Sequence, residues 1–334
     1  ASLYLRTKMI YTKSSSFFFN LMDQQTSKYL MLIRPRNFSS NEETLASNDF
    51  QHGFNESSNL SEIRENVDTE FTNMINHLSQ HDIEHIVFDD IKGLGSPDAI
   101  FPNNWITFHE EGIVVLYPMM SSKRRNERRL DIIESLSKYG FSVSNTIDMS
   151  YLENKSEYLE GTGSMILDRV SKKAYACISS RTTTKALSVF SDTMNYKIIE
   201  FRSTTDIPIY HTNVMMSLGE DTALVCFDAI EEKEFCSQLE MELKDTGRTV
   251  IDVSIDQMNN FLGNSLEVRN KKNEKYLLMS ETARKSLKVE QEKIIEDRLN
   301  LLSIPIPTIE KYGGGSVRCM LAEIFLEKEH QQDI

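Results

Sequence analysis

The sequence of 334 residues contains few cysteines, few glycines, no long apolar run and no surplus of positive charge. Its four cysteines, Cys177, Cys226, Cys236 and Cys319, form no Cys-x-x-Cys pair, so neither a disulfide framework nor a zinc or thioredoxin-like site is supported. Scattered reduced thiols favour a cytosol-like compartment, and we expect a cytoplasmic protein. No apolar stretch approaches the length of a membrane span, and the formal net charge of −13 argues against a nucleic-acid partner.

The first 22 residues differ from the rest of the chain. They carry Arg6, Lys8 and Lys13, no acidic residue, several serines and three consecutive phenylalanines. This composition resembles a weak organelle-targeting leader, and upstream sequence foreign to the native protein explains it equally well. We therefore expect residues 1–27 to be peripheral and residues 28–330 to form a single α/β domain.

Five short apolar runs, each bounded by polar or turn residues, predict buried strands at residues 29–35, 113–119, 174–179, 223–227 and 276–280. Charged segments with helical spacing follow three of them. The first places Leu130, Ile133 and Leu136 on one stripe and ends at Gly140, the second ends at Gly247, and the third begins with Ser280 as N-cap. This alternation favours a cyclic α/β repeat over a doubly wound sheet, although an ordinary α/β domain fits the same pattern.

The segment from Ser39 to Asp68 is rich in Asn, Ser and Glu and predicts a long loop. Such a loop in a compact domain is often functional, for example as an active-site lid.

The run GGGSVRCMLAEI (313–324) is the strongest chemical signal, because three of only thirteen glycines stand together just before Cys319. Consecutive glycines let the backbone approach a ligand closely, and a thiol beside such a turn can be exposed to substrate. A cysteine attacks as its thiolate, which Arg318 could favour. A glycine turn followed by a buried, inert cysteine explains the same residues.

Three further runs hold residues that could cooperate with a cysteine. His211, in YHTNVMM, is a candidate base, although a lone histidine is more often structural. Glu160, at the turn EGTGSM, could orient a histidine or be a surface carboxylate. Asn103 and Asn104 stand beside the only tryptophan, Trp105, and could line a polar pocket or cap a strand.

Taken together, FPNNW, EGTGSM, YHTNVMM and GGGSVRCMLAEI resemble the guanidine-modifying enzyme (pentein) superfamily of arginine and agmatine deiminases, dimethylarginine hydrolases and amidinotransferases. They look most like its bacterial citrulline-utilisation, amidinotransferase-like branch, over roughly residues 28–325. The resemblance implies a five-bladed pseudo-symmetric α/β propeller with one catalytic site at its axis. It further implies Cys319 as nucleophile, His211 as general acid and base, and Glu160 as partner of the histidine, with no cofactor and no metal.

Two departures from the superfamily pattern bear on the substrate. Asn103-Asn104 replaces an Arg-Asp pair, and Asn213 replaces the aspartate of His-x-Asp. In the relatives the two aspartates clamp a cationic guanidinium, whereas an amide offers both a donor and an acceptor, which suits a neutral ureido group. We therefore expect Asn104 and Asn213 to hold the reacting group, with the neighbouring side chains Asn103, Trp105 and Arg318 also at the substrate site.

The function expected from the resemblance is hydrolysis of citrulline to ornithine, CO2 and NH3 through an S-carbamoyl enzyme. An arginine or amidine deiminase, an amidinotransferase and a catalytically silent binding protein remain alternatives. The partner is a small amino acid, and a homo-oligomer is compatible with the sequence. Weaker candidates for anchoring the substrate, or for entering the site, are Arg34, Arg181, Asn41, Glu43, Asn48, Gln51 and Glu310.

Other polar clusters have simple structural explanations. The arginines 124, 125, 128 and 129 are expected to be exposed. His81 and His85 have helical spacing but no third ligand, which favours a solvated helix face over a metal site.

Overall fold

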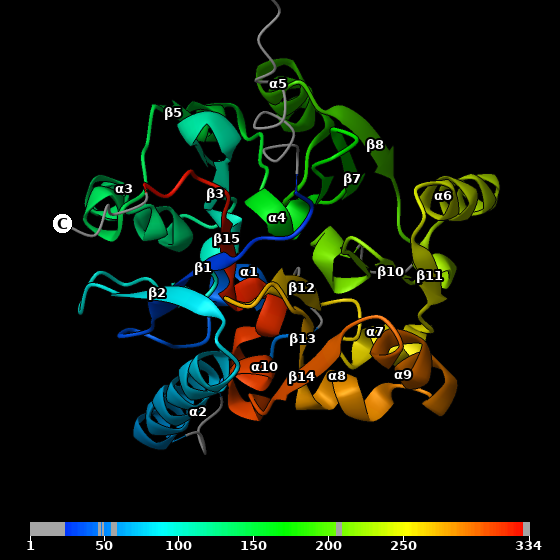
Figure 1. Cartoon of the computed structure of the whole chain (residues 1–334). Coiled ribbons are helices and arrows are strands. Elements are labelled where there is room, and N and C mark those ends of the chain that lie inside the picture. Colours follow the sequence, from blue (N-terminus) through cyan, green and yellow to red (C-terminus); the bar gives the residue numbers. More distant parts are fainter. Residues whose placement is uncertain (1–23, 46–47, 49, 55–58, 205–208, 330–334) are drawn as a thin grey trace, which may run out of the picture.

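The computed structural model describes residues 24–45, 48, 50–54, 59–204 and 209–329, and within them five separate three-stranded sheets. Figure 1 shows the sheets arranged as blades around a common centre, with the chain visiting them in sequence order. The expected five-bladed α/β propeller is confirmed by this arrangement.

Each blade has the same strand pattern. A central strand pairs antiparallel with one neighbour and parallel with the other in all five sheets. The central strands are β1 (Tyr29–Arg34), β4 (Ile113–Leu116), β7 (Lys173–Cys177), β10 (Thr222–Val225) and β13 (Lys275–Ser280). These are the five strands expected from the sequence. Their apolar runs are continuous because a strand in the middle of a covered sheet buries both of its faces.

The antiparallel partners line the axis of the ring, where β15 contacts β3 and β9 contacts both β6 and β12. These inner strands are β3 (Ile106–His109), β6 (Ile166–Asp168), β9 (Met216–Leu218), β12 (Leu266–Arg269) and β15 (Ala322–Ile324). The parallel partners are β2 (Glu84–Asp89), β5 (Asn145–Asp148), β8 (Lys197–Phe201), β11 (Thr249–Asp252) and β14 (Asn300–Ile304).

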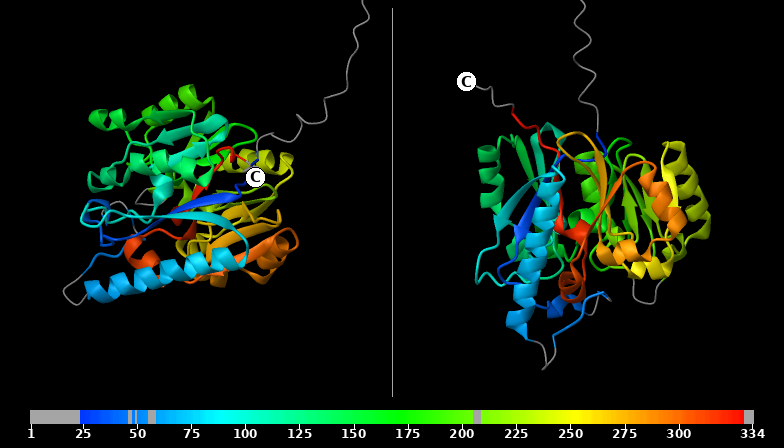
Figure 2. Two further views of the ribbon diagram at one scale, coloured as in Figure 1. Left: turned by 60° about the vertical axis from the view of Figure 1, so that its left-hand side comes forward. Right: turned by 60° about the horizontal axis from the view of Figure 1, so that its bottom comes forward.

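Helices make the crossovers that parallel pairing requires. They are α2 (Leu60–Gln80), α3 (Leu130–Ser135), α5 (Thr184–Met194), α6 (Lys233–Asp245), α8 (Glu281–Ser286) and α9 (Val289–Glu296). They occupy the rim in Figure 1, and α2 runs along an outer edge of the molecule in both views of Figure 2. The short helix α1 (Glu42–Leu45) precedes α2 in the first crossover, and α4 (Gly161–Ser164), α7 (Ile255–Asn259) and α10 (Pro307–Gly313) belong to the connections between blades.

The ring closes between the two ends of the chain. Strand β15 pairs with β1, with Ile324 opposite Tyr29, so the first blade contains both the first and the last strand. Figure 1 shows the red C-terminal strand beside blue β1 near the centre. The position of every residue on β15 and just before it therefore depends on this closure.

The helical predictions are correct in outline and wrong in some details. Gly140 and Gly247 adopt the left-handed conformation that ends a helix, and Ser280 accepts a hydrogen bond from Ala283 N as N-cap. The third segment, however, forms two helices and strand β14. Leu130 is 58% exposed because it stands at the first position of α3, where the buried face begins only with Ile132.

Two predicted boundaries also shift. The long loop ends earlier than expected, because α2 already begins at Leu60 with Asn59 as its N-cap. Gln25, Thr26 and Ser27, grouped with the leader above, are buried, and Gln25 donates to the carbonyls of Leu167 and Leu218. The rest of that leader, residues 1–23, lies outside the described residues. No helix in the described ranges is long and apolar enough to cross a membrane.

Candidate active site

The candidate site lies where the turns that lead into the inner strands meet. The 3-10 turn η1 (Pro102–Asn104) precedes β3, α4 precedes β6, η6 (Thr212–Val214) precedes β9, and η8 (Val317–Met320) precedes β15. Since the inner strands surround the axis, these turns converge: α4 contacts η1 and η6, and η1 contacts η8. Residues from four distant parts of the sequence thereby reach one place.

A small pocket, with about 20 Å³ of space for a water-sized molecule, opens at this convergence. It is lined by Thr44, Asn48, Asp98, Phe101, Asn104, Arg124, Arg181, Tyr210, His211, Gly313, Gly314, Gly315 and Cys319. Cys319, His211 and Asn104, three residues expected from the sequence, share this pocket.

His211 and Glu160 form a buried pair, with 2.8 Å between Nε2 and the carboxylate Oε2. Burial opposes ionisation of Glu160, but the hydrogen bond from His211 and the charges of Arg181 and Arg124 lower its pKa to about 2. Burial lowers the pKa of His211 to about 4 against the opposing effect of Glu160. The imidazole is therefore neutral near pH 7, with its Nε2 proton donated to the carboxylate and Nδ1 left as the basic nitrogen.

Cys319 is 3% exposed and sits on η8 directly after the glycine turn. Its Sγ lies 3.4 Å from Asn213 Nδ2 and 3.2 Å from Asn264 Nδ2, both of which are donors. Gly314 has a φ of +64°, and a Cβ there would lie 2.5 Å from Asn48 Nδ2. Glycine is thus required for the turn itself and for the segment that packs on it.

The predicted loop does cover the site in its described part. Asn48 donates to Gly314 O at 3.3 Å, and Gln51 donates to Tyr312 O at 3.1 Å. Asn41 donates to Asp98 at 2.8 Å, and the carboxylate of Glu43 accepts from Ser121 and Ser122. These contacts tie the loop to the glycine turn and to the wall of the pocket.

Several residues expected at the substrate site lie outside the pocket. Asn103 is fully buried behind Asn104 and accepts from its Nδ2 at 3.0 Å, while Trp105 packs in a hydrophobic core. Arg318 donates to Leu321 O and Glu323, on the side of η8 away from the pocket. Asn103, Trp105 and Arg318 are thus placed to support the site rather than to line it, because the turn that presents one side chain inward points its neighbour outward.

Two of the weaker candidates also lie elsewhere. Arg34 is at the end of β1, where it pairs with Asp68 and donates to Thr72 on α2. Glu310 accepts from Ser316 and Thr282 at 2.7 Å each, so it supports the glycine turn from beneath.

Two charged residues of the pocket, Arg124 and Asp98, were not expected there from the sequence. Arg124 is 2% exposed, contrary to expectation, because it pairs with Glu127 at 2.9 Å and lies near Asp98 and Glu160 at 3.7 and 3.6 Å. Its Nη1 also donates to Asn104 Oδ1 at 2.9 Å. Burial raises the pKa of Asp98 despite the nearby Arg124, and among the described residues its Oδ1 has no hydrogen-bond partner. No local sequence signal separates Arg124 from the arginines beside it.

No group of three or more His, Cys, Asp or Glu side chains in the described part of the chain could hold a metal ion. The helical spacing expected for His81 and His85 is also absent, since α2 ends at Gln80 and His85 lies on β2.

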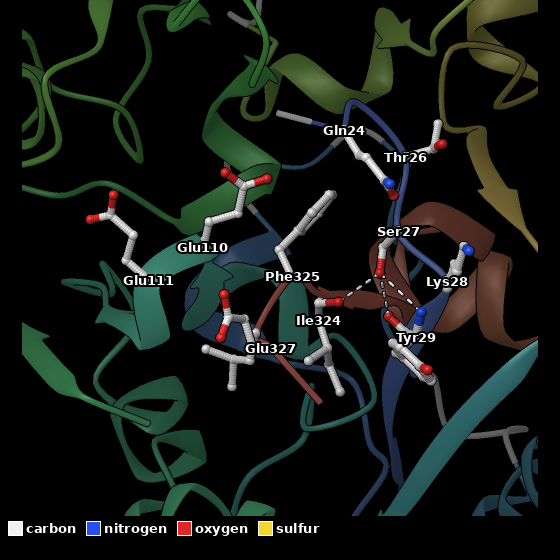
Figure 3. Close-up of a pocket in the computed structure, with 11 residues that line it drawn as sticks. Gln24, Thr26, Ser27, Lys28, Tyr29, Glu110, Glu111, Ile324, Phe325 and Glu327 are labelled. Atoms are coloured by element: carbon white, nitrogen blue, oxygen red, sulfur yellow. Dashed lines mark hydrogen bonds between the residues drawn. The ribbon is translucent and has the colours of Figure 1, made fainter. Parts of the chain in front are cut away.

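A larger pocket, about 270 Å³, lies beyond the opposite end of β15 from Cys319 (Figure 3). Its wall includes Phe325, the carboxylates of Glu110, Glu111 and Glu327, and the segment before β1, where Ser27 donates to Ile324 O at 2.8 Å. Neither a cysteine nor a histidine lines it. Of these two pockets, only the smaller is lined by Cys319 and His211.

Comparison with protein families matches residues 34–326 to the family described as N,N dimethylarginine dimethylhydrolase, eukaryotic. No curated protein sequence matches the chain significantly.

Several solved structures share the fold. The N-terminal domain of ArgZ, an arginine dihydrolase from Cyanobacteria, is 15% identical with a TM-score of 0.67, over 89% of this chain and 97% of that chain. AgrE, in a binary complex with L-arginine, is 14% identical with a TM-score of 0.69, over 92% of this chain and 41% of that chain. A dimethylarginine dimethylaminohydrolase bearing an adduct with S-methyl-L-thiocitrulline is 13% identical with a TM-score of 0.62, over 89% of this chain and all of that chain.

Proposed function

The chain belongs to the eukaryotic N,N-dimethylarginine dimethylhydrolase family of the pentein superfamily, and from this membership and the site we propose a cysteine-dependent C–N hydrolase. The observation that carries the proposal is the common pocket of Cys319 and His211, with His211 bound to the buried carboxylate of Glu160. The pairing of a thiol with a base that a third group orients is the arrangement of nucleophilic catalysis.

Within this class, the substrate we propose is a ureido amino acid, with citrulline the preferred member. Two positions that touch the reacting region carry carboxamides: Asn104 lines the pocket, and Asn213 touches Sγ through Nδ2. Among the described residues, the buried Oδ1 of Asn213 has no hydrogen-bond partner. A ureido group can satisfy both an amide donor and an amide acceptor. Because the ureido group is neutral, these two amides need not supply a counter-ion for it, as they would for a guanidinium.

In the proposed reaction, His211 accepts the thiol proton, and Cys319 Sγ bonds to the ureido carbon. The bond from that carbon to the δ-nitrogen breaks as His211 returns the proton to the leaving amine, which gives ornithine and an S-carbamoyl enzyme. His211 then takes a proton from water, whose oxygen bonds to the carbamoyl carbon while the C–S bond breaks. The released carbamate decomposes to CO2 and NH3, so one water is consumed for each citrulline.

Charged side chains that line the pocket are suited to bind the α-ammonium and α-carboxylate groups of an amino acid. Asp98, whose Oδ1 has no hydrogen-bond partner among the described residues, is placed to accept from an α-ammonium group. Arg124 and Arg181 line the same pocket and supply positive charge for an α-carboxylate. This assignment gives a zwitterionic substrate a charge partner at each of its two groups.

A second candidate is hydrolysis of arginine itself, because ArgZ is an arginine dihydrolase and AgrE is seen with L-arginine. In that case the thiolate would displace ammonia from the guanidinium carbon, and water would release citrulline. An amidinotransferase would give product only when an acceptor amine is added.

The experiment incubates the purified protein separately with citrulline and arginine and measures ornithine, citrulline and ammonia. Ornithine from citrulline, abolished in Cys319→Ala and retained in Cys236→Ala, supports the ureidase. Cys236 is the matched control because it is a partly exposed thiol that contacts Phe227 O, on another blade. Citrulline accumulating from arginine would replace the proposal with a deiminase, and no turnover of either substrate would refute both candidate reactions.

A further inference from the structure

One of the five inner strands has no functional residue assigned to the turn before it. The turns before β3, β6, β9 and β15 carry Asn104, Glu160, His211 and Cys319. The remaining inner strand, β12, follows a tight turn after α7 that ends in Asn264 and Ser265. Asn264 stands two residues before its strand, as Asn104 does before β3.

Asn264 lies directly against the sulfur. Its Nδ2 is 3.2 Å from Cys319 Sγ and 3.0 Å from the backbone carbonyl of Asn213, while its Oδ1 is 3.6 Å from Sγ. Its side chain is fully buried. Because Asn213 Nδ2 also lies 3.4 Å from Sγ, the sulfur has an amide donor from each of two neighbouring blades.

The orientation of the Asn264 amide follows from its surroundings. A backbone carbonyl only accepts hydrogen bonds, so the group that faces Asn213 O must be the NH2. That NH2 has two hydrogens, one for the carbonyl and one for the sulfur. The carboxamide therefore meets Sγ side-on, with its donor at 3.2 Å and its acceptor at 3.6 Å.

The backbone around Asn264 is built to allow this contact. A Cβ at Gly263 would lie 2.3 Å from Val214 O and 2.8 Å from the carbonyl carbon of Met215, so only glycine lets this turn reach η6. The backbone N–H of Asn264 donates to Phe261 O at 2.9 Å, and Phe261 itself has a φ of +63°. A turn held this closely fixes the side chain that it presents.

We propose that Asn264 is a further catalytic residue, whose carboxamide holds the sulfur of Cys319 in both of its protonation states. The proposal rests on the proposed role of Cys319 as nucleophile. Nδ2–H donates to the thiolate before attack, and Oδ1 accepts from the thiol after product release. A neutral amide can fill both roles without changing its charge, which a carboxylate or an ammonium group cannot do.

The test compares Asn264→Leu, which keeps the size but removes the donor and the acceptor, with Asn260→Ala. Asn260 is the matched control because it caps the end of α7 on the same connection and bonds only within it, to Asp256 O. Alkylation of Cys319 by iodoacetamide is followed from pH 6 to 10 by mass spectrometry, together with kcat and KM for the substrate that the wild type cleaves.

Asn264→Leu is expected to slow alkylation at neutral pH roughly ten- to a hundredfold and to move its profile to higher pH, because a hydrogen bond to a charged group is lost. We expect kcat to fall by a similar factor with KM unchanged, since Asn264 does not line the pocket. Wild-type alkylation and wild-type kcat in folded Asn264→Leu would overturn the proposal. If that variant fails to fold, Asn264→Ser, too short to reach the sulfur, decides by the same criteria.

The labelling needs no substrate, so the two proposals fail separately. If the wild-type protein cleaves neither citrulline nor arginine, yet its alkylation depends on Asn264, the proposed reaction is refuted and the proposed contact of Asn264 with the sulfur is supported. If the wild-type protein cleaves citrulline and neither alkylation nor kcat changes in the Asn264 variants, the role of Asn264 is refuted and the proposed reaction is supported.

Discussion

Gly163 leaves no room for a side chain beside two residues of the pocket. A Cβ added there would lie 2.4 Å from Asn104 Nδ2, 2.8 Å from His211 Nδ1 and 2.9 Å from His211 Cε1. Ordinary contact of a Cβ begins at 3.4 Å, so Gly163→Ala must displace Asn104 and His211 by up to about 1 Å. Both displaced groups line the pocket.

The expected loss is set by this displacement. A misplacement of about 1 Å at a reacting group can cost roughly a hundredfold in rate, which corresponds to about 2.7 kcal/mol of barrier. The free energy of unfolding should fall by about 1–3 kcal/mol, the usual cost of overpacking. Backbone strain adds nothing, because Gly163 is not among the residues with positive φ.

The measurement is kcat/KM of Gly163→Ala together with its urea unfolding curve. Gly219→Ala is the matched control, since its Cβ would lie 2.0 Å from Glu267 Oε2, outside the pocket, and Gly219 has no positive φ either. We expect both variants to be destabilised and only Gly163→Ala to lose activity. Wild-type kcat/KM in a folded Gly163→Ala would refute the placement of Asn104 and His211 as reacting groups.

Three further predictions concern stability and reactivity. Because the pKa of His211 is lowered to about 4 and that of Glu160 to about 2, protons bind the unfolded chain more tightly. Urea titrations should therefore show His211 contributing a loss of roughly 3 kcal/mol from pH 6.5 to 4 and Glu160 a further loss below pH 4.5, and the first loss should be smaller by that amount in His211→Gln. The carboxylate of Glu70 on α2 accepts the first backbone N–H groups of α10 at 2.9–3.1 Å, so Glu70→Ala, which removes this acceptor, should lose about 1 kcal/mol in urea unfolding while the exposed Glu65→Ala loses nothing. Iodoacetamide at pH 7.5 should label Cys319 well before Cys177, because burial raises the pKa of Cys177 to about 12, and the opposite order would favour a silent site.

The central strands were predictable because their physical signal is local. Each is buried on both faces and so reads as a continuous apolar run. The inner strands carry no such signal: β6 and β15 have three residues each, too few for any periodicity. Their existence depends on pairing, and β15 pairs with β1 at the other end of the chain. The three-stranded blade could therefore not be predicted from the sequence pattern.

The residues of the candidate site were likewise predictable only where their signal is local in the sequence. Cys319, His211 and Glu160 stand in unusual local contexts, and the family resemblance supplied their roles. Arg124 stands among other arginines, and its burial depends on Glu127 and on Asp98, which comes from a different connection. Asn264 gives no composition signal at all, since its contact with the sulfur exists only after two blades pack together.

The pseudo-symmetry of the fold explains why the site is built from single residues far apart in sequence. The turns before the inner strands meet at the axis and the crossover connections add further side chains, so no single blade contains the site. The position of Cys319 depends on both ends of the chain, because Cys319 precedes β15, the strand that closes the ring by pairing with β1. Until that last pairing forms, the donors on the turns before β9 and β12 have no sulfur to hold. Formation of the environment of Cys319 is therefore coupled to closure of the whole propeller, rather than to the folding of any one blade.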